Sequence, residues 1–258
     1  MKGILAFIIF TILMILPARG NREQEVGIVE KLGNKVPLDL VFTNDEGKQL
    51  KLGDIINKPT ILMFVYYHCP GICSPLLTGV SEVVDKLDLT PGKDYTLVTI
   101  SFDHTETSDK AKKWKENHLK GLEKQIDPNG WYFLVGDSIS VRKITDAIGF
   151  YFKPDGKGDF IHSAALYSIA PDGKIIRYLF GTEFNPFDFK MAVLEAEKGL
   201  PLPTVNRLLK FCYSYDPQGR RYMFNFTRVF GTLILLSLGV FFVILIKKQR
   251  KIKEVKNG

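Results

Sequence analysis

The sequence predicts an α/β domain with a mixed central sheet flanked by helices, followed by one C-terminal transmembrane helix. Apolar runs rich in β-branched and aromatic residues alternate with segments of helical periodicity, and this alternation ends in a β-hairpin. The transmembrane helix is predicted from an uncharged run of 18 residues, 229–246. At ~1.5 Å per residue, such a run is long enough for the hydrocarbon core of a bilayer.

The elements of the domain are expected in a regular order. Turn formers at 44–47 predict a first hairpin, and Asp137 is the expected N-cap of a helix. Proline and glycine within 170–174 predict the turn of the last hairpin. The predicted strands are 38–42, 49–52, 60–67, 95–102, 131–135, 164–169 and 175–180, and the predicted helices are 73–87, 108–119, 137–148 and 187–197.

The net charge of +7 on the 258 residues lies at the two ends of the chain. Lys2, Arg19 and the basic tail 247–258 account for all of it, so the rest holds equal numbers of basic and acidic residues. A nucleic-acid-binding domain needs a basic face, and we therefore expect no nucleic-acid partner.

The N-terminal end is typical of an exported protein. Lys2 precedes the apolar run 4–16, and small residues follow at Ala18 and Gly20. This pattern predicts a signal peptide at 1–20, with an uncleaved N-terminal anchor as the alternative.

The C-terminal end indicates the topology. The basic tail 247–258 directly follows the predicted span 229–246, and positive charge gathers on the cytoplasmic side of a membrane helix. We therefore expect a single-pass protein of a bacterial inner (plasma) membrane. Its functional domain, 21–200, is expected on the extracytoplasmic (periplasmic) side, joined to the span by a juxtamembrane connector at 201–228.

Cys69 and Cys73 lie where a predicted buried strand gives way to a predicted helix. The unpaired N–H groups and positive dipole end of a helix stabilise a thiolate, and four-residue spacing brings both sulfurs to one helical face. Thiolates are soft donors that select Cu(I), and an imidazole is a natural third donor. The pair indicates metal or redox chemistry, with two inert packed cysteines as the alternative.

Three stretches carry a resemblance to a known family: 58–73 with its Cys-Pro-Gly-Ile-Cys sequence, 97–103, and Ile161-His162 followed by a strand that ends in Pro-Asp-Gly. Over roughly residues 35–200 the chain resembles the Sco/SenC copper-delivery proteins of the thioredoxin superfamily. The resemblance implies a thioredoxin-like fold and places the family's metal ligands on Cys69, Cys73 and His162.

The resemblance also implies a function. It implies binding of Cu(I) and Cu(II) and delivery of copper to the dinuclear copper centre of cytochrome c oxidase subunit II during oxidase assembly. Other copper chaperones are further candidate partners. No residue is assigned as catalytic and no enzyme activity is firmly expected, although Cys69 and Cys73 would be the redox-active pair of a reductase.

The sequence departs from the family pattern in three places. Ser74 separates the second cysteine from Pro75, and Ile161 replaces the acid usually found before the histidine, the nearest acid being Asp159. The clear membrane anchor is C-terminal, whereas the family usually has an N-terminal one. The first two departures could alter Cu(II) affinity or redox poise, but no ligand is lost.

Other residues are weaker candidates. His68 adjoins Cys69 but could point to the opposite side of the strand, and His104 could lie behind the site. Asp103 could orient a ligand histidine or cap a helix, whereas His118 is expected on a solvated surface. Cys212, near the membrane, could be a packed cysteine or an auxiliary copper or redox cysteine.

A second function remains open at this stage, an extracytoplasmic thiol–disulfide oxidoreductase that keeps oxidase cysteines reduced. Reductants of the thioredoxin type use CxxC opposite a cis-proline, whereas this chain has CxxxC and, in the facing segment, Ile161-His162-Ser163. A histidine there suits a metal better than disulfide exchange. A peroxide-reducing relative would need a different cysteine context.

Overall fold

The structure, a computed structural model, describes residues 26–201, 213–216 and 221–224, together with residues 231, 234 and 237. Among these described residues, no helix has the length and apolar character needed to cross a membrane. The predicted signal peptide 1–20, the tail 247–258 and almost all of the span 229–246 lie outside the described residues. Cys212 also lies outside them.

A seven-stranded sheet forms the centre of the domain, in the order β11-β10-β4-β5-β6-β2-β3. The strands β4, β5 and β6 are parallel, and the strands on either side of them are antiparallel. The sheet strands are β2 (Val41–Asn44), β3 (Gln49–Lys51), β4 (Thr60–Val65), β5 (Thr96–Ser101), β6 (Trp131–Val135), β10 (Ala165–Ile169) and β11 (Ile175–Phe180). The predicted mixed α/β sheet is therefore confirmed.

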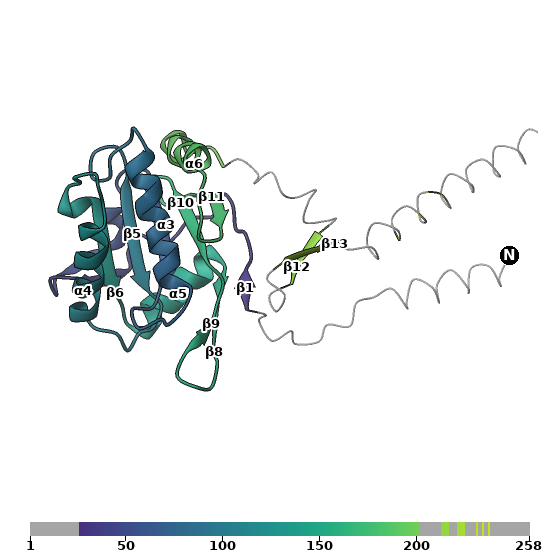
Figure 1. Ribbon diagram of the computed structural model, residues 1–258, viewed down its shortest axis with the longest axis horizontal. Helices are drawn as coiled ribbons and strands as arrows, with labels where there is room; N and C mark the ends of the chain where they lie inside the picture. Colours follow the sequence, from purple (N-terminus) through teal and green to yellow (C-terminus); the bar gives the residue numbers. More distant parts are fainter. Residues whose placement is uncertain are drawn as a thin grey trace, which may run out of the picture.

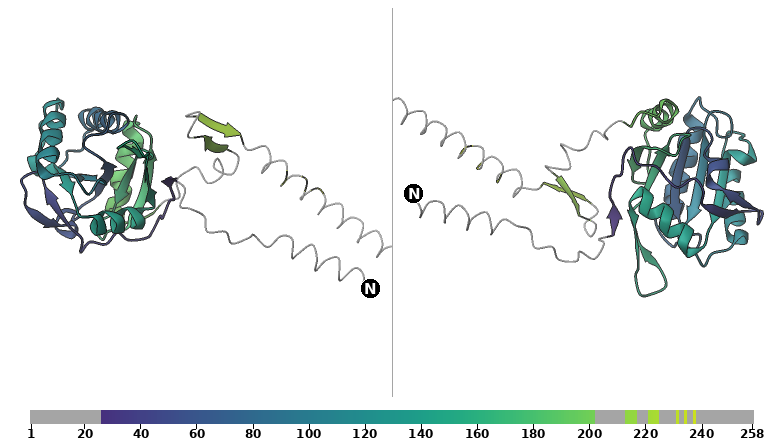
Figure 2. Two further views of the ribbon diagram at one scale, coloured as in Figure 1. Left: turned by 90° about the horizontal axis from the view of Figure 1, so that it is seen from below. Right: turned by 180° about the vertical axis from the view of Figure 1, so that it is seen from behind.

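Helices cover both faces of this sheet (Figures 1 and 2). Because β4, β5 and β6 follow one another in one direction, right-handed crossovers place the two connecting helices on the same face. The chain then returns across the sheet to β10, which puts α5 on the other face. The helices are α2 (Leu52–Ile55), α3 (Cys73–Lys86), α4 (Ser108–Lys120), α5 (Ser138–Ile148) and α6 (Pro186–Lys198).

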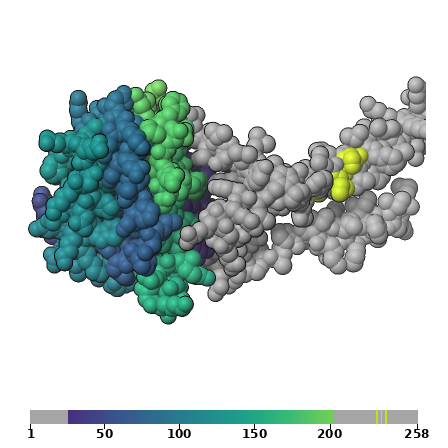
Figure 3. All heavy atoms as spheres, viewed as in Figure 1, coloured from purple at the N-terminus to yellow at the C-terminus, as the bar shows by residue number. Residues whose placement is uncertain are grey.

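On the first face, α3 lies between α4 and α6 (Figure 3). Its Gly79 allows a close approach, since a Cβ there would stand only 1.9 Å from the carbonyl oxygen of Thr182. The cysteine-bearing helix is therefore held tightly against the segment that leads from β11 to α6.

Short elements complete the described chain. The hairpin of β8 and β9 projects from the domain on the side where β1 lies (Figure 1). The remaining elements are β1 (Gly27–Ile28), η1 (Pro128–Gly130), β7 (Phe150–Tyr151), β8 (Lys153–Pro154), β9 (Phe160–Ile161), β12 (Tyr213–Asp216) and β13 (Arg221–Phe224).

The first hairpin is shorter than predicted, since β2 begins at Val41 rather than at 38. The carbonyls of Leu38 and Leu40 accept hydrogen bonds from the N–H groups of Gly53 and Leu52, at the start of α2. This stretch therefore pairs with a short helix that the sequence pattern did not reveal.

Candidate metal and thiol site

Cys69 lies in the loop between β4 and α3, and Cys73 is the first residue of α3. All six residues of β4 are buried, which fixes where the loop begins. The N-cap residue, Ile72, offers no side-chain hydrogen bond to the helix. The N–H groups around this helix end are free for another acceptor, and the Cys69 sulfur uses them: the N–H of Gly71 lies 3.4 Å from Sγ.

His162 reaches the cysteines from the segment between β9 and β10. This segment leads into β10, which is antiparallel to β4, so the start of β10 meets the end of β4. Its Nε2 lies 3.8 Å from Cys73 Sγ, and its Nδ1 lies 3.1 Å from the carbonyl oxygen of Ser163. Since a carbonyl can only accept, Nδ1 carries a hydrogen, and Nε2 is the nitrogen that faces the sulfur.

The structure thus brings together the three residues predicted as ligands. One donor atom from each of Cys69, Cys73 and His162 lies within 4.8 Å of the other two. Cys73 is buried, whereas Cys69 is half-exposed, and both thiols are free. We call these three residues the Cys–His group.

The two thiols differ in acidity. The pKa of Cys69 lies well below its ordinary value, above all because the Cys73 thiol donates a hydrogen bond to it; His162 and the N–H groups of Cys73 and Gly71 add to this, while burial opposes it. The same sulfur–sulfur hydrogen bond, together with burial, raises the pKa of Cys73. At neutral pH the pair therefore holds one proton, with the thiolate on Cys69.

Aromatic rings line the inner side of the site. The His162 ring meets Tyr66, Phe102 and Phe150 edge-on, with ring centroids 5.7, 4.9 and 6.1 Å away. The Tyr66 hydroxyl donates to Asp159 Oδ1 at 3.3 Å, and burial, followed by the neighbouring Cys69, raises the pKa of Tyr66. The rings restrict water on this side, so the half-exposed Cys69 marks the open side.

A second group forms beside the first, and His68 belongs to it rather than to the Cys–His group. His68 Nδ1 lies 2.7 Å from Glu106 Oε1 and 3.8 Å from Asp103 Oδ2. Donor atoms of His68, Asp103 and Glu106 lie within 4.8 Å of one another. We call these three residues the His–carboxylate group.

Asp103 does not cap the following helix. The N-cap of α4 is Thr107, and Asp103 Oδ1 instead accepts from the N–H and hydroxyl of Thr105. Its other oxygen faces His68, so it lies beside a histidine other than the predicted ligand. His104 is exposed and belongs to neither group.

The prediction for His118 was wrong. Its ring is half-buried and packs against Trp114, Trp131 and Phe133, and burial lowers its pKa. The reason is that α4 lies against β6, so one face of this charged helix is covered. His118 is therefore a packing residue.

Sequence reasoning missed Glu106 and Tyr66. Glu106 has a fully buried side chain, yet it stands in the polar run 104–109, where nothing local separates a buried acid from a solvated one. Tyr66 was assigned to a buried strand, and only the turn that follows β4 brings it to the site. One signal was available for Glu106: it follows the buried strand that faces the cysteine loop.

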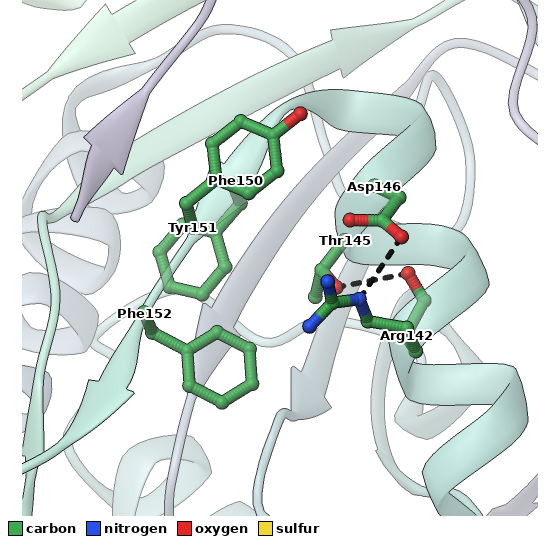
Figure 4. A pocket seen from close by; sticks show the side chains of 6 residues that line it. All are labelled: Arg142, Thr145, Asp146, Phe150, Tyr151 and Phe152. Atoms are coloured by element: carbon green, nitrogen blue, oxygen red, sulfur yellow. Dashed lines mark hydrogen bonds and ion pairs between the residues drawn. The ribbon is translucent and has the colours of Figure 1, made fainter. Parts of the chain in front are cut away.

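A hollow lies elsewhere, on α5 and β7, and Figure 4 shows its six lining residues. Arg142 Nε forms an ion pair with Asp146 Oδ2 at 3.0 Å across one wall, and the rings of Phe150 and Phe152 form another. No residue of the Cys–His group or of the His–carboxylate group lines it. Among the described residues, both groups that could hold a metal ion therefore lie near the end of β4, away from this hollow.

Fold and site together define a class: a thioredoxin-like protein with two free cysteines at a helix N-terminus and a histidine just before the facing strand. The comparison with protein families makes this more specific. The SCO1/SenC family model matches residues 31–193, which is more than half of the chain, and the chain belongs to that family.

Individual relatives agree. The SCO1 protein homolog of Bacillus subtilis (strain 168) is 26% identical over 190 residues, which cover 72% of this chain and 91% of the relative. An Aquifex aeolicus crystal structure, described as that of a candidate electron transfer protein, is 31% identical with a TM-score of 0.60 and covers 65% of this chain and 95% of its own.

Two more distant structures share the fold. Arabidopsis thaliana ScoI with copper bound is 21% identical, with a TM-score of 0.51, over 62% of this chain and 96% of its own. BsSco, described as a member of the Sco family of cytochrome c oxidase assembly proteins with a disulfide switch, is 22% identical, with a TM-score of 0.52, over 66% and 98%.

Proposed function

We propose that the chain is a copper metallochaperone that carries copper on Cys69, Cys73 and His162 and delivers it during assembly of cytochrome c oxidase. The observation that supports this most is the Cys–His group itself: three soft or borderline donor atoms within 4.8 Å of one another, reached from two different segments. The copper-bound Arabidopsis relative and the oxidase assembly role of the Sco family point the same way.

The donor set suits copper as cargo. Two thiolates satisfy Cu(I), and the imidazole nitrogen gives Cu(II) a donor that it prefers. Calcium and magnesium would need oxygen ligands, which the Cys–His group lacks. Cys73 must lose its proton to solvent when it binds, whereas the thiolate of Cys69 is already available.

The recipient and the location are parts of the proposal. We infer that the recipient is the dinuclear copper centre of oxidase subunit II, outside the cytoplasm. The domain 21–200 would be exported by the signal peptide 1–20 and held over the membrane by the span 229–246. A reporter fused after Gly258 should be active only in the cytoplasm and one fused at Gly199 only outside. The opposite pattern contradicts this topology.

The thiol–disulfide oxidoreductase is the second candidate, and one observation favours it. The thiolate on half-exposed Cys69, with the protonated Cys73 beside it, is the arrangement of an attacking and a resolving cysteine. His162 separates the two functions, because disulfide exchange needs only the two thiols whereas copper binding also uses the imidazole.

Oxidase assembly in cells at limiting copper tests the proposal. His162→Ala should lose oxidase activity and regain part of it when copper is added, while disulfide formation between Cys69 and Cys73 persists. The exposed His104 supplies the control, since His104→Ala should behave as the wild type. If His162→Ala supported full assembly at limiting copper while Cys69→Ser did not, the reductase would replace the metallochaperone.

A further inference from the structure

The two ring nitrogens of His68 differ because, in the described part of the chain, Nδ1 is paired with a carboxylate and Nε2 is not. Nδ1 lies 2.7 Å from Glu106 Oε1, and the ring is 41% exposed, whereas the side chains of Glu106 and Asp103 are 0% and 6% exposed. The ring thus has one edge on buried carboxylates and the other in solvent. Among the described residues, no hydrogen bond to Nε2 is found.

Glu106 is held rigidly. Its Oε2 accepts from the N–H of Tyr67 at 2.6 Å and from the hydroxyl of Ser101 at 2.7 Å. Lys110 Nζ lies 3.5 Å from Oε1 and supplies a positive charge. A carboxylate with these partners cannot turn away, so it fixes the orientation of the His68 ring.

This arrangement matches that of a metal-binding histidine. Such histidines nearly always donate their second ring N–H to a carboxylate or a backbone carbonyl, which fixes the tautomer and the ring direction. His162 uses the carbonyl of Ser163 for this, and His68 uses Glu106. When the ring is neutral and Nδ1 donates to Glu106, the lone pair of His68 is on Nε2.

His68 itself lies beside the open side of the Cys–His group. His68 directly precedes Cys69, the half-exposed cysteine, whereas Cys73 is buried. The Tyr66 ring contacts both imidazoles, with its centroid 5.0 Å from that of His68 and 5.7 Å from that of His162. His68 is therefore outside the three-donor group but next to its entrance.

We propose that His68 is a transient copper ligand, which receives Cu(I) at the entrance through Nε2 and passes it to Cys69, and that Glu106 is its positioning residue. This inference rests on the proposed copper function. The transfer is a ligand exchange: the Nε2–copper bond forms as a ligand of the source leaves, and it breaks as the Cys69 Sγ–copper bond forms. Copper stays Cu(I), no electron moves, and delivery reverses the order.

The rate and the affinity of copper transfer test this separately. The full-length chain, loaded with Cu(I), is mixed with the Cu(I) chelator bathocuproine disulfonate, and both the release rate and the equilibrium are measured. His68→Gln should slow release and uptake by about tenfold while the affinity changes by less than about twofold, and free imidazole should restore the rate of His68→Ala. His104→Gln, a change at the other exposed histidine of this region, should match the wild type.

The results distinguish the possible failures. An unchanged rate in His68→Gln overturns the inference, and so does a loss of affinity in step with the rate, which would make His68 a resident ligand. Glu106→Gln should also slow transfer; since it could unfold, its circular dichroism is checked, and His68→Gln decides alone if the fold is lost. A wild-type chain that retains no copper instead contradicts the proposed function itself.

Discussion

Two imidazoles contact the ring of Tyr66, and their surroundings differ. His162 lies among aromatic rings and faces the sulfur of Cys73, while His68 lies on buried carboxylates and faces solvent. The first belongs to a group of soft donors, and the second to a group in which carboxylate oxygens hold the ring. The difference teaches that one side of the cysteine loop holds the three metal donors, while the other side holds an imidazole in place through buried carboxylates, and mutation can separate the two.

The largest effect is expected at the buried cysteine. Cys73→Ser replaces a soft donor by a hard, protonated hydroxyl, so the full-length chain should lose nearly all of its Cu(I) in competition with a chelator. The fold should be retained, because serine is close to cysteine in size. Copper retention equal to the wild type would remove Cys73 from the site.

The next largest effect is expected at Glu106, whose replacement should lower the free energy of unfolding. Glu106→Ala leaves the N–H of Tyr67, the hydroxyl of Ser101 and His68 without their acceptor. Destabilisation of about 3 kcal/mol is expected, or a fall of roughly 5–10 °C in melting temperature. Glu116→Ala, at an exposed acid of α4, the helix that follows Glu106, serves as the control and should change stability by less than ~0.5 kcal/mol. Equal melting temperatures for the two variants would show that the anchoring is unimportant.

The unequal acidity of the thiols predicts that the alkylation rate of Cys69 changes little with pH. The lowered pKa of Cys69 means that its thiolate fraction stays constant as the pH falls from about 8 to about 5, whereas an ordinary thiol would lose about tenfold in reactivity per pH unit. Alkylation by iodoacetamide, followed by mass spectrometry, should therefore show a nearly constant rate at Cys69 over this range. Cys73, whose pKa is raised, should stay unmodified. A steep rise of the Cys69 rate with pH contradicts the assignment.

The smallest effect is expected at Tyr66, whose hydroxyl donates to Asp159 and lies near enough to Cys69 for that thiol to raise the pKa of Tyr66. Tyr66→Phe removes a polar group beside the thiolate and should raise the alkylation midpoint of Cys69 by less than about one pH unit, since one hydrogen bond contributes about 1 kcal/mol. Phe102→Leu alters the same wall without removing a hydroxyl and should leave the midpoint unchanged. A midpoint in Tyr66→Phe equal to that of the wild type would mean that the ring acts only by packing.

Much of the fold could be predicted because its local signals agree with its tertiary structure. Asp137 caps α5 through the N–H groups of Ile139 and Ser140, and the strands at 131–135 and 175–180 coincide with β6 and β11. The first strand was predicted to begin at Leu38, three residues too early. The carbonyls of Leu38 and Leu40 instead accept hydrogen bonds from the start of α2.

The Cys–His group could be predicted from the sequence, whereas the His–carboxylate group could not. Spacing at a strand–helix junction indicated Cys69 and Cys73, and the family resemblance supplied His162. Glu106 could not be found this way, because its burial results from the packing of α4 against the sheet and leaves no local pattern. The same packing covers His118, which the sequence placed in solvent.

X-ray absorption of the Cu(I)-loaded full-length chain tests the central claim most directly. The wild type should show a copper environment of two sulfur atoms and one nitrogen, and His162→Ala should lose the nitrogen while keeping both sulfurs. A shell of only oxygen and nitrogen atoms, or a chain that retains no copper, would contradict the claim that Cys69, Cys73 and His162 carry the metal.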